Sequence, residues 1–247
     1  MKTIVRADDL GYSEAVNYGI AKAVKEGIIN NVSLMINMPY SEYAYELISE
    51  YDICLGLHTN ISAGEPISEV GAVASLVEGA RFKKSSHYHS SSDDLLDLDQ
   101  VILEIQNQVN KFEEITGFSP RYIDVHAVLS SKFIQAAKIV ADQNNIPFVG
   151  VNFNDGNILI NNKEVKMYVE NGEDEEDLYR SFFSTILDST DTNIPLLVYH
   201  PGFIDAPLIR SSSLITERAV QTSFLTSAEL KSAVAKYGID FLRIDEV

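Results

Sequence analysis

Short apolar runs alternate along the chain with longer segments in which apolar residues recur every three or four positions. The short runs have the length and composition of buried strands, and the longer segments have the spacing of amphipathic helices. Strands are expected at residues 3–7, 32–36, 53–57, 121–125, 148–153, 196–199 and 241–244. Helices are expected at about 13–27, 41–50, 98–116, 132–143, 175–187 and 227–236, the first between an N-cap at Ser13 and a stop at Gly27.

This alternation of strand and helix occurs about seven times, without a recognisable linker or internal repeat. Such a pattern is typical of a parallel sheet covered by helices, which is either doubly wound or closed as a barrel. The number of units within 247 residues favours a barrel-like closure. We therefore expect an α/β fold of mainly parallel strands, a TIM-like (β/α) barrel formed by a single domain over residues 1–247.

Residues 59 to about 97 interrupt the alternation. They contain several turn-forming glycine and proline residues and then a stretch rich in serine and histidine. A segment of this length without a clear period is either disordered or functional, and we expect a lid-like insertion at about 59–97. Because His87 and His89 lie among serines without other ligand residues nearby, an exposed loop is expected there rather than a second metal site.

Acidic residues outnumber basic residues by 36 to 19, which gives a net charge of −17. Such a surface repels phosphate backbones and anionic lipid headgroups, so neither a nucleic acid nor a membrane is expected as a partner. A neutral or cationic small substrate is compatible with this charge, and the sequence leaves open whether the chain forms a homo-oligomer. The acidic run at 173–177 is interpreted as the start of a helix, where carboxylates interact favourably with the helix dipole.

The N-terminus passes directly from Met1 and Lys2 into a strand-like run without an apolar signal segment, which predicts a cytoplasmic location. Cys54 is the only cysteine, so no intramolecular disulfide is expected, as is usual in a reducing compartment. Because it lies in an apolar run, Cys54 is interpreted as a small buried hydrophobic residue.

Residues that commonly bind metals follow four of the predicted strands. Asp8 and Asp9 come after the first strand, and His58, His126 and His200 each follow another. In an α/β barrel the carboxyl ends of all strands meet at one mouth, where active sites are built. A carboxylate with two imidazoles suits Zn²⁺ or a similar divalent cation and leaves positions open for water and substrate. The sequence therefore predicts a metal site at this end of the sheet.

Two features of these strand ends depend on local geometry. Asp124 lies two residues before His126, so both side chains share one face of an extended strand. Asp124 either orients a metal ligand from behind or forms a buried pair with a basic residue, and the sequence leaves both alternatives open. Asp8 and Asp9 point to opposite faces of a regular strand, so both reach one site only where the strand has already turned.

Six sequence blocks carry a more specific signal. They are RADDLGYS at 6–13, NYGI at 17–20, GLHTN at 56–60, GEP at 64–66, YIDVH at 122–126 and HPGFID at 200–205. In this order, and over nearly the whole chain, they resemble the YdjC-like carbohydrate deacetylases, which include the chitooligosaccharide deacetylases. No G-x-S-x-G elbow, P-loop or dinucleotide-binding glycine fingerprint competes with this interpretation.

The resemblance implies a deformed (β/α) barrel that hydrolyses the N-acetyl group of an amino sugar or short chitooligosaccharide. Asp9, His58 and His126 would be the metal ligands, and Asp8 the general base that takes a proton from the attacking water. The metal of the family is usually given as Mg²⁺, whereas two imidazole ligands suit Zn²⁺ better. His200 is a candidate general acid for the departing amine, with an alternative role as the anchor of the turn that follows it.

The sequence departs from the family pattern after His126. Members of the family commonly continue with further histidines, whereas this chain has Ala127, Val128 and Leu129. The three implied ligands survive this change, but substrate contacts or proton transfer by the additional histidines are lost. A non-catalytic sugar-binding or regulatory protein on the same scaffold therefore stays an alternative function.

A second alternative is a metal hydrolase that acts on a different ester or amide. A basic cluster at the mouth of the barrel would favour a phosphate ester, and its candidates are Arg6, Arg81, Lys83 and Lys84. If a sugar binds instead, the aromatic side chains in the 59–97 segment are candidates for stacking on its ring. These are Phe82 and Tyr88.

Overall fold

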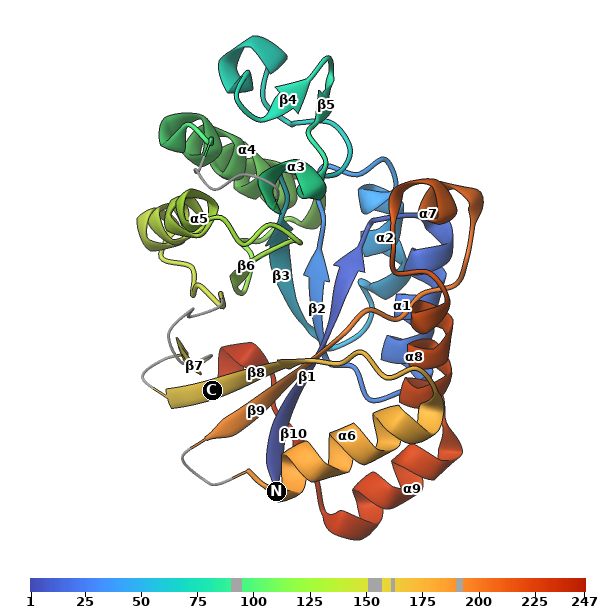
Figure 1. The fold of residues 1–247 in the computed structure, drawn as a ribbon. Coiled ribbons are helices and arrows are strands. Elements are labelled where there is room, and N and C mark those ends of the chain that lie inside the picture. The colour runs from blue at the N-terminus through green and yellow to red at the C-terminus, as the bar shows by residue number, and fades with distance from the viewer. Residues whose placement is uncertain (90–94, 151–156, 161–162, 190–192) are drawn as a thin grey trace.

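The structure is a computed structural model that describes residues 1–89, 95–150, 157–160, 163–189 and 193–247. Its main feature is a curled, mostly parallel sheet that forms a half-barrel with helices around it (Figure 1). The expected α/β fold, a deformed (β/α) barrel with mainly parallel strands, is confirmed. The larger sheet has eight strands, in the order β6-β3-β2-β1-β9-β8-β7, with β10 paired to β1.

Every described strand pair of this sheet is parallel except β7 with β8. The strands are β1 (Lys2–Leu10), β2 (Asn31–Leu34), β3 (Cys54–Thr59), β6 (Ile123–Val125), β7 (Asn157–Ile160), β8 (Lys163–Val169), β9 (Ile194–Tyr199) and β10 (Asp240–Phe241). A separate antiparallel hairpin is formed by β4 (Val77–Glu78) and β5 (Arg81–Phe82).

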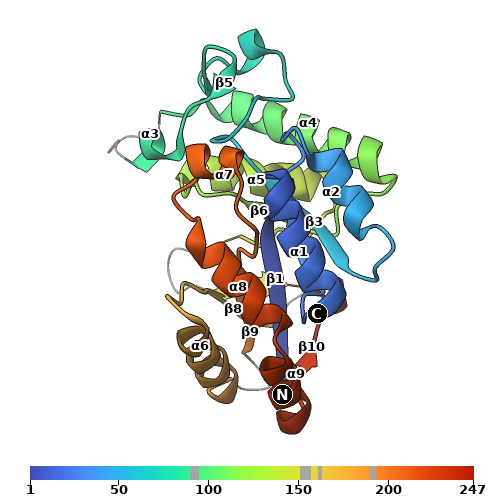
Figure 2. The same ribbon diagram turned by 90° about the vertical axis from the view of Figure 1, so that its right-hand side faces the viewer.

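Helices cover the outside of the curled sheet (Figures 1 and 2). The longer ones are α1 (Glu14–Glu26), α2 (Ser41–Ile48), α4 (Leu98–Thr116), α5 (Ser131–Asn144), α6 (Glu175–Leu187), α8 (Thr216–Thr226) and α9 (Ala228–Tyr237). The shorter ones are η1 (Val70–Val73), α3 (Ser85–His89), α7 (Ala206–Ser211) and η2 (Ile244–Glu246). No helix in the described part of the chain is both long and apolar enough to cross a membrane.

Local sequence signals set several helix ends as expected. The Ser13 hydroxyl accepts a hydrogen bond from the Val16 amide at the start of α1, and Gly27 ends that helix. The acidic run begins α6, with Asp174 as its N-cap. Of the strand expected at 148–153, only Phe148 forms a bridge, to Ile123, and residues 151–153 lie outside the described residues.

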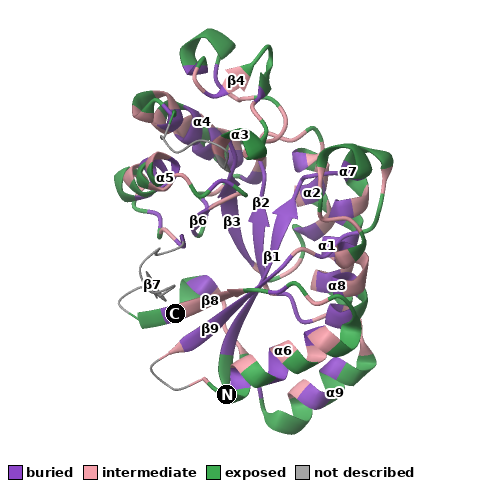
Figure 3. Cartoon of the chain, in the orientation of Figure 1, coloured by how far each residue is buried: buried purple, intermediate pink, exposed green. Residues whose placement is uncertain are grey.

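The alternation of side chains along β1 divides the interior into two parts. Val5 and Ala7 pack in the large apolar cluster between the sheet and the helices, whereas Ile4 packs in a smaller cluster with Cys54. Because successive side chains of a strand point to opposite faces, Arg6 and Asp8 share the face of Ile4. Strands β1, β2, β3 and β9 are buried almost throughout, β8 is only partly buried, and the outer faces of the helices are exposed (Figure 3).

The described part of the 59–97 segment is tied to α4. The buried Glu104 carboxylate accepts hydrogen bonds from the amides of Ile67 and Ser68, at 3.0 and 2.9 Å. The Tyr88 hydroxyl donates to main-chain carbonyls within the same segment. The single-domain organisation, the role of this segment as a lid and the stacking of Tyr88 on a sugar remain predictions.

The packing on the inner face of the sheet can be tested by substitution of Gly56 on β3. A Cβ atom at this position would lie 2.3 Å from the ring of Tyr122, which is fully buried and hydrogen-bonded to Ser33. Gly56→Ala should therefore lower the free energy of unfolding by about 1–3 kcal/mol, the usual cost of overpacking a core. Denaturant unfolding measures this change.

The matched control is Gly71→Ala, because a Cβ atom there would meet no heavy atom within 4 Å. Its free energy of unfolding should stay within about 0.5 kcal/mol of the wild-type value. Equal stability of the two variants would contradict the packing of Tyr122 against Gly56.

Candidate metal centre

β1 brings two consecutive aspartates to one site because its backbone leaves the regular strand conformation at Asp9. The φ angle of Asp9 is 71°, in the left-handed region that aspartate tolerates better than most residues. The pairing of β1 with β2 also shifts register between Ala7 and Leu10, and such a bulge redirects a side chain. A carboxylate oxygen of Asp8 and one of Asp9 consequently both lie within 4.8 Å of a ring nitrogen of His58.

Three atoms that can bind a metal face one another at the ends of β1, β3 and β6. Asp9 Oδ1 lies 2.9 Å from His126 Nδ1 and 3.4 Å from His58 Nε2, and the two ring nitrogens are 3.2 Å apart. Asp9 and His58 are buried, whereas His126 is partly exposed and gives the site an open side.

The donor set and its spacing fit one divalent cation. Metal–ligand bonds of about 2.0–2.2 Å to a carboxylate and two imidazoles bring the ligand atoms to separations of this size. The near polar neighbours of the buried Asp9 Oδ1 are the ring nitrogens of His126 and His58, the two groups that would share a metal with it.

Asp124 satisfies both of the alternatives that the sequence leaves open. Its Oδ1 lies 3.0 Å from His58 Nδ1, so that His58 Nε2 is the ring nitrogen left for a metal. Its Oδ2 lies 2.9 Å from Arg6 Nη2 and accepts a hydrogen bond from the Ser33 hydroxyl at 3.1 Å. Asp124 therefore orients the imidazole and also belongs to a buried ion pair.

Arg6 separates the two groups of candidate ligands. Asp8, His58 and Asp124 also lie close enough together to hold a cation. However, Arg6 donates to both oxygens of Asp8, at 2.6 and 2.8 Å, and pairs with Asp124. Because Arg6 occupies both oxygens of Asp8, whereas Oδ1 of Asp9 accepts from no arginine, the group formed by Asp9, His58 and His126 is the better candidate metal site.

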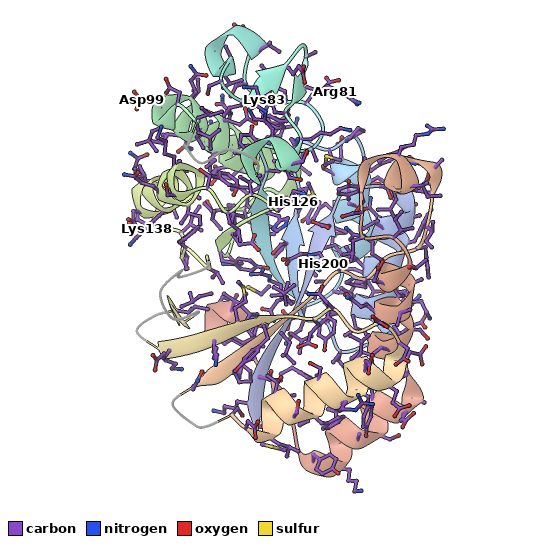
Figure 4. All side chains as sticks on the ribbon, in the orientation of Figure 1. Arg81, Lys83, Asp99, His126, Lys138 and His200 are labelled. Atoms are coloured by element: carbon purple, nitrogen blue, oxygen red, sulfur yellow. The ribbon has the colours of Figure 1, made fainter. Side chains whose placement is uncertain are left out.

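His200 lies near this centre but belongs to neither group of candidate ligands. Its main-chain amide donates to Gln221 Oε1 at 2.5 Å, and its Nδ1 is buried without a hydrogen-bond partner among the described residues. Burial lowers the pKa of His200, and the carboxylates of Asp9 and Asp8 oppose this change. Figure 4 shows His126 and His200 inside the molecule, away from Arg81 and Lys83 at the hairpin.

The positions after His126 do not replace the histidines that the family pattern leads one to expect. Ala127 adopts a φ of 51°, so the chain turns directly after His126. Val128 is buried in the apolar core, and Leu129 is exposed. None of these three side chains can take part in proton transfer.

Arg218 is the main residue of this centre that the sequence did not indicate. It lies on α8, a helix that the apolar pattern did not predict, and its side chain is only 2% exposed. Its Nη2 donates to Asp9 Oδ2 at 2.5 Å, across 209 positions of sequence. No signal in the sequence links these two residues.

A pocket of about 530 Å³ lies beside the centre. Tyr12 lies between the pocket and the centre: it lines the pocket, and the centre of its ring is 6.3 Å from that of the His126 ring. Other lining residues include aromatic and basic side chains. They are Tyr40, Phe82, Arg81, Lys84 and Arg210.

The structure corrects the expected basic cluster at the mouth. Arg81 and Lys84 line the pocket, and Arg210 joins them from α7. Arg6 is instead buried between Asp8 and Asp124, and the Lys83 ammonium donates to a main-chain carbonyl of its own segment. The buried guanidinium of Arg6 is paired with these carboxylates, because an isolated charge inside a protein is unfavourable in free energy.

Metal binding to the metal-free protein should strengthen as the pH rises. Although burial disfavours its charged form, the carboxylates of Asp124 and Asp8 raise the pKa of His58 to about 10. Below this pH a cation must displace the His58 proton, so the apparent affinity should rise about tenfold per pH unit for one proton released. Calorimetric titration with Zn²⁺ from about pH 6 to 9, in buffers of different ionisation enthalpy, measures both the apparent affinity and the number of protons released.

Asp124→Asn provides the control, because it removes the carboxylate that most strongly favours the protonated imidazole. The pH dependence of metal affinity should be shallower in this variant. An affinity of the wild-type protein that does not change with pH would show that His58 releases no proton to the metal.

Comparison with known proteins identifies the family and agrees with the fold. The family model described as YdjC-like protein matches residues 2–236. The chain is 30% identical over 237 positions to a carbohydrate deacetylase of Thermoanaerobacter pseudethanolicus, with 92% of this chain and 91% of that protein covered. It is 27% identical over 256 positions to a chitooligosaccharide deacetylase of Proteus mirabilis, with 95% and 94% covered.

Solved structures share the fold. A crystal structure from Enterococcus faecalis V583 matches with a TM-score of 0.82 and 22% identity over 99% of this chain and 97% of that one. A family 4 acetyl xylan esterase from Clostridium thermocellum, in complex with a cobalt ion, matches with a TM-score of 0.56 and 9% identity, over 100% and 89%. The family match extends over nearly the whole chain, and the chain therefore belongs to the YdjC-like protein family.

Proposed function

We propose that this protein is a metal-dependent deacetylase that hydrolyses the N-acetyl group of an amino sugar or short chitooligosaccharide. The observation that carries the proposal is the approach of Asp9 Oδ1, His58 Nε2 and His126 Nδ1 to within 3.4 Å of one another. The names of the relatives, carbohydrate deacetylase and chitooligosaccharide deacetylase, supply the reaction and the substrate class.

Asp9, His58 and His126 would hold one divalent cation. When bound, the cation polarises the acetyl carbonyl and stabilises the negative charge that develops on its oxygen. Two imidazoles favour Zn²⁺ among the common ions, whereas the family resemblance favours Mg²⁺. Asp124 keeps the His58 ring in the orientation that this role needs, through its 3.0 Å contact with Nδ1.

Asp8 is proposed as the general base that accepts a proton from the attacking water. Burial alone would raise the pKa of its carboxyl, but the Arg6 guanidinium and the neighbouring His58 lower it, so the group is ionised at neutral pH. Arg6 also fixes the position of Asp8 by donating to both of its oxygens. The pairing with Arg6 lowers the basicity of the Asp8 carboxylate but fixes its orientation.

His200 is proposed as the general acid that gives a proton to the departing amine, a role that needs the protonated imidazole, which burial disfavours and the carboxylates of Asp9 and Asp8 favour. The hydrogen bond of its amide to Gln221 fixes its backbone, and its buried Nδ1 has no described partner. Protonation of a leaving group by a positioned side chain contributes about 10²–10⁴-fold to the rate.

The pocket beside the centre is the proposed sugar-binding site. Tyr12, Tyr40 and Phe82 offer aromatic surface for a sugar ring, and a volume of about 530 Å³ is typical of a small-molecule site. Phe82 lines this pocket from β5, but its side chain is mostly buried in the apolar core, so its stacking on a sugar stays a prediction.

A second candidate function is favoured by the basic rim of this pocket. Arg81, Lys84 and Arg210 line it, and no acidic residue does so among the described residues, although the chain carries a net charge of −17. A phosphate ester would be attracted to such a rim. Phosphate release from p-nitrophenyl phosphate, without acetate release from diacetylchitobiose, would favour this function over deacetylation.

The deciding experiment is acetate release from diacetylchitobiose by metal-stripped protein to which Mg²⁺, Zn²⁺, Mn²⁺ or Co²⁺ is added back. Restoration by one of these cations is the expected result. Binding of metal and of the disaccharide without turnover would instead favour the non-catalytic sugar-binding alternative.

His126→Ala should abolish acetate release, because the variant lacks one of the three proposed ligands. Its circular dichroism spectrum should match that of the wild-type protein, since the His126 side chain is partly exposed. His87→Ala is the control, because His87 is an exposed histidine that does not line the pocket, and it should retain wild-type activity. An active His126→Ala variant would remove His126 from the ligand set.

His200→Ala should lower kcat by about 10²–10⁴-fold while the affinity for the metal is retained. Steady-state kinetics and metal titration of the same preparation separate these effects. Normal kcat together with a lower melting temperature would instead assign His200 to anchoring the turn at Pro201 and Gly202.

A further inference from the structure

One helix, α8, contacts two parts of the candidate centre that lie far apart in sequence. The Arg218 side chain reaches Asp9 on β1, and the Gln221 side chain reaches the His200 amide after β9. Thr222 accepts a hydrogen bond from the Gly202 amide at 2.8 Å. Figure 2 shows α8 running beside α1 and in front of β1, in the position these contacts require.

The Arg218 guanidinium is held from several directions. Its Nε donates to the Leu214 carbonyl at 3.1 Å, and its Nη2 donates to Asp9 Oδ2 at 2.5 Å. The guanidinium carbon lies 5.5 Å from the centre of the Tyr12 ring. A Cβ atom on Gly202 would come within 3.2 Å of Arg218 Cδ, so the aliphatic part of the side chain is closely packed as well. Arg218 has little freedom to move away from Asp9.

The contact with Arg218 decides which oxygen of Asp9 is presented to the histidines. A carboxylate rotates readily about its last bond unless its oxygens are bound. Arg218 takes Oδ2, and Oδ1 is left facing His126 Nδ1 at 2.9 Å and His58 Nε2 at 3.4 Å. The left-handed backbone conformation at Asp9 sets the direction of its side chain, and Arg218 fixes the rotation of its carboxylate.

We propose that Arg218 is a positioning residue that holds Asp9 Oδ1 in the orientation needed to bind the metal. The proposal rests on the proposed function only in that Asp9, His58 and His126 bind a divalent cation. Residues that orient a metal ligand from behind typically change metal affinity by about 10–100-fold when they are replaced.

A purely electrostatic role for Arg218 predicts the opposite result. A guanidinium beside the site repels a divalent cation, so removing its charge would strengthen metal binding if charge were all that mattered. Positioning of Asp9 predicts weaker binding after the same substitution. The sign of the change in affinity therefore separates the two roles.

The experiment measures Co²⁺ affinity and the visible Co²⁺ spectrum in wild-type protein, Arg218→Met and Arg218→Lys. Arg218→Met should bind Co²⁺ about 10–100-fold more weakly, with an altered spectrum, because Asp9 loses its fixed rotation. Arg218→Lys should fall between the two, since an ammonium can pair with Asp9 but lacks the planar, forked geometry of the guanidinium. Wild-type or tighter Co²⁺ affinity in Arg218→Met would overturn the proposal.

Arg180→Met is the matched control, because Arg180 is an exposed arginine on α6 whose described ion pairs are with Glu176 and Asp177. Its Co²⁺ affinity and spectrum should equal those of the wild-type protein. If Arg218→Met does not fold, Arg218→Lys decides alone, and an unchanged affinity and spectrum in that variant would reject the proposal.

Activity measurements keep this proposal distinct from the proposed function. If wild-type protein binds Co²⁺ but releases no acetate from diacetylchitobiose, deacetylation fails while the role of Arg218 is still decided by the titration. If acetate is released and Arg218→Met binds Co²⁺ as tightly as the wild-type protein does, the role of Arg218 fails and deacetylation stands.

Discussion

Three buried carboxylates, those of Asp8, Asp9 and Asp124, and two buried guanidinium groups, those of Arg6 and Arg218, are joined by ion pairs near the end of β1. Charges removed from water are very unfavourable unless they are paired and hydrogen-bonded. Arg6 pairs with two of the carboxylates and Arg218 with the third. One negative charge remains in excess, which the proton on His58 offsets in the metal-free protein and which a divalent cation would offset after displacing that proton.

This ion-pair network also explains why the fold and the site depend on each other. The network joins β1 to β6 through Arg6 and Asp124, and β1 to α8 through Asp9 and Arg218. Breaking one of these pairs would leave a buried charge without its partner, which destabilises a protein strongly. The same contacts orient His58 and Asp9, so the interactions that hold these elements together also set the geometry of the proposed metal site.

The charge of the molecule is distributed unevenly around this centre. The chain as a whole is strongly acidic, yet the pocket beside the centre is lined by Arg81, Lys84 and Arg210. The basic rim would favour an anionic ligand, whereas the buried carboxylates of the proposed metal site would favour a cation.

The sequence by itself determined the alternation of strands and helices and the placement of Asp9, His58 and His126 at strand ends, because apolar periodicity and strand length are local properties. Tertiary structure decided the bulge that redirects Asp9 and the two contacts of Asp124. It also decided the role of Arg218, which lies on a helix that the pattern did not reveal. The buried residues of α8 include Arg218, Gln221 and Thr222, whose polar groups bind the site. A helix that turns polar side chains inward has no apolar stripe, so only the folded chain shows what it does.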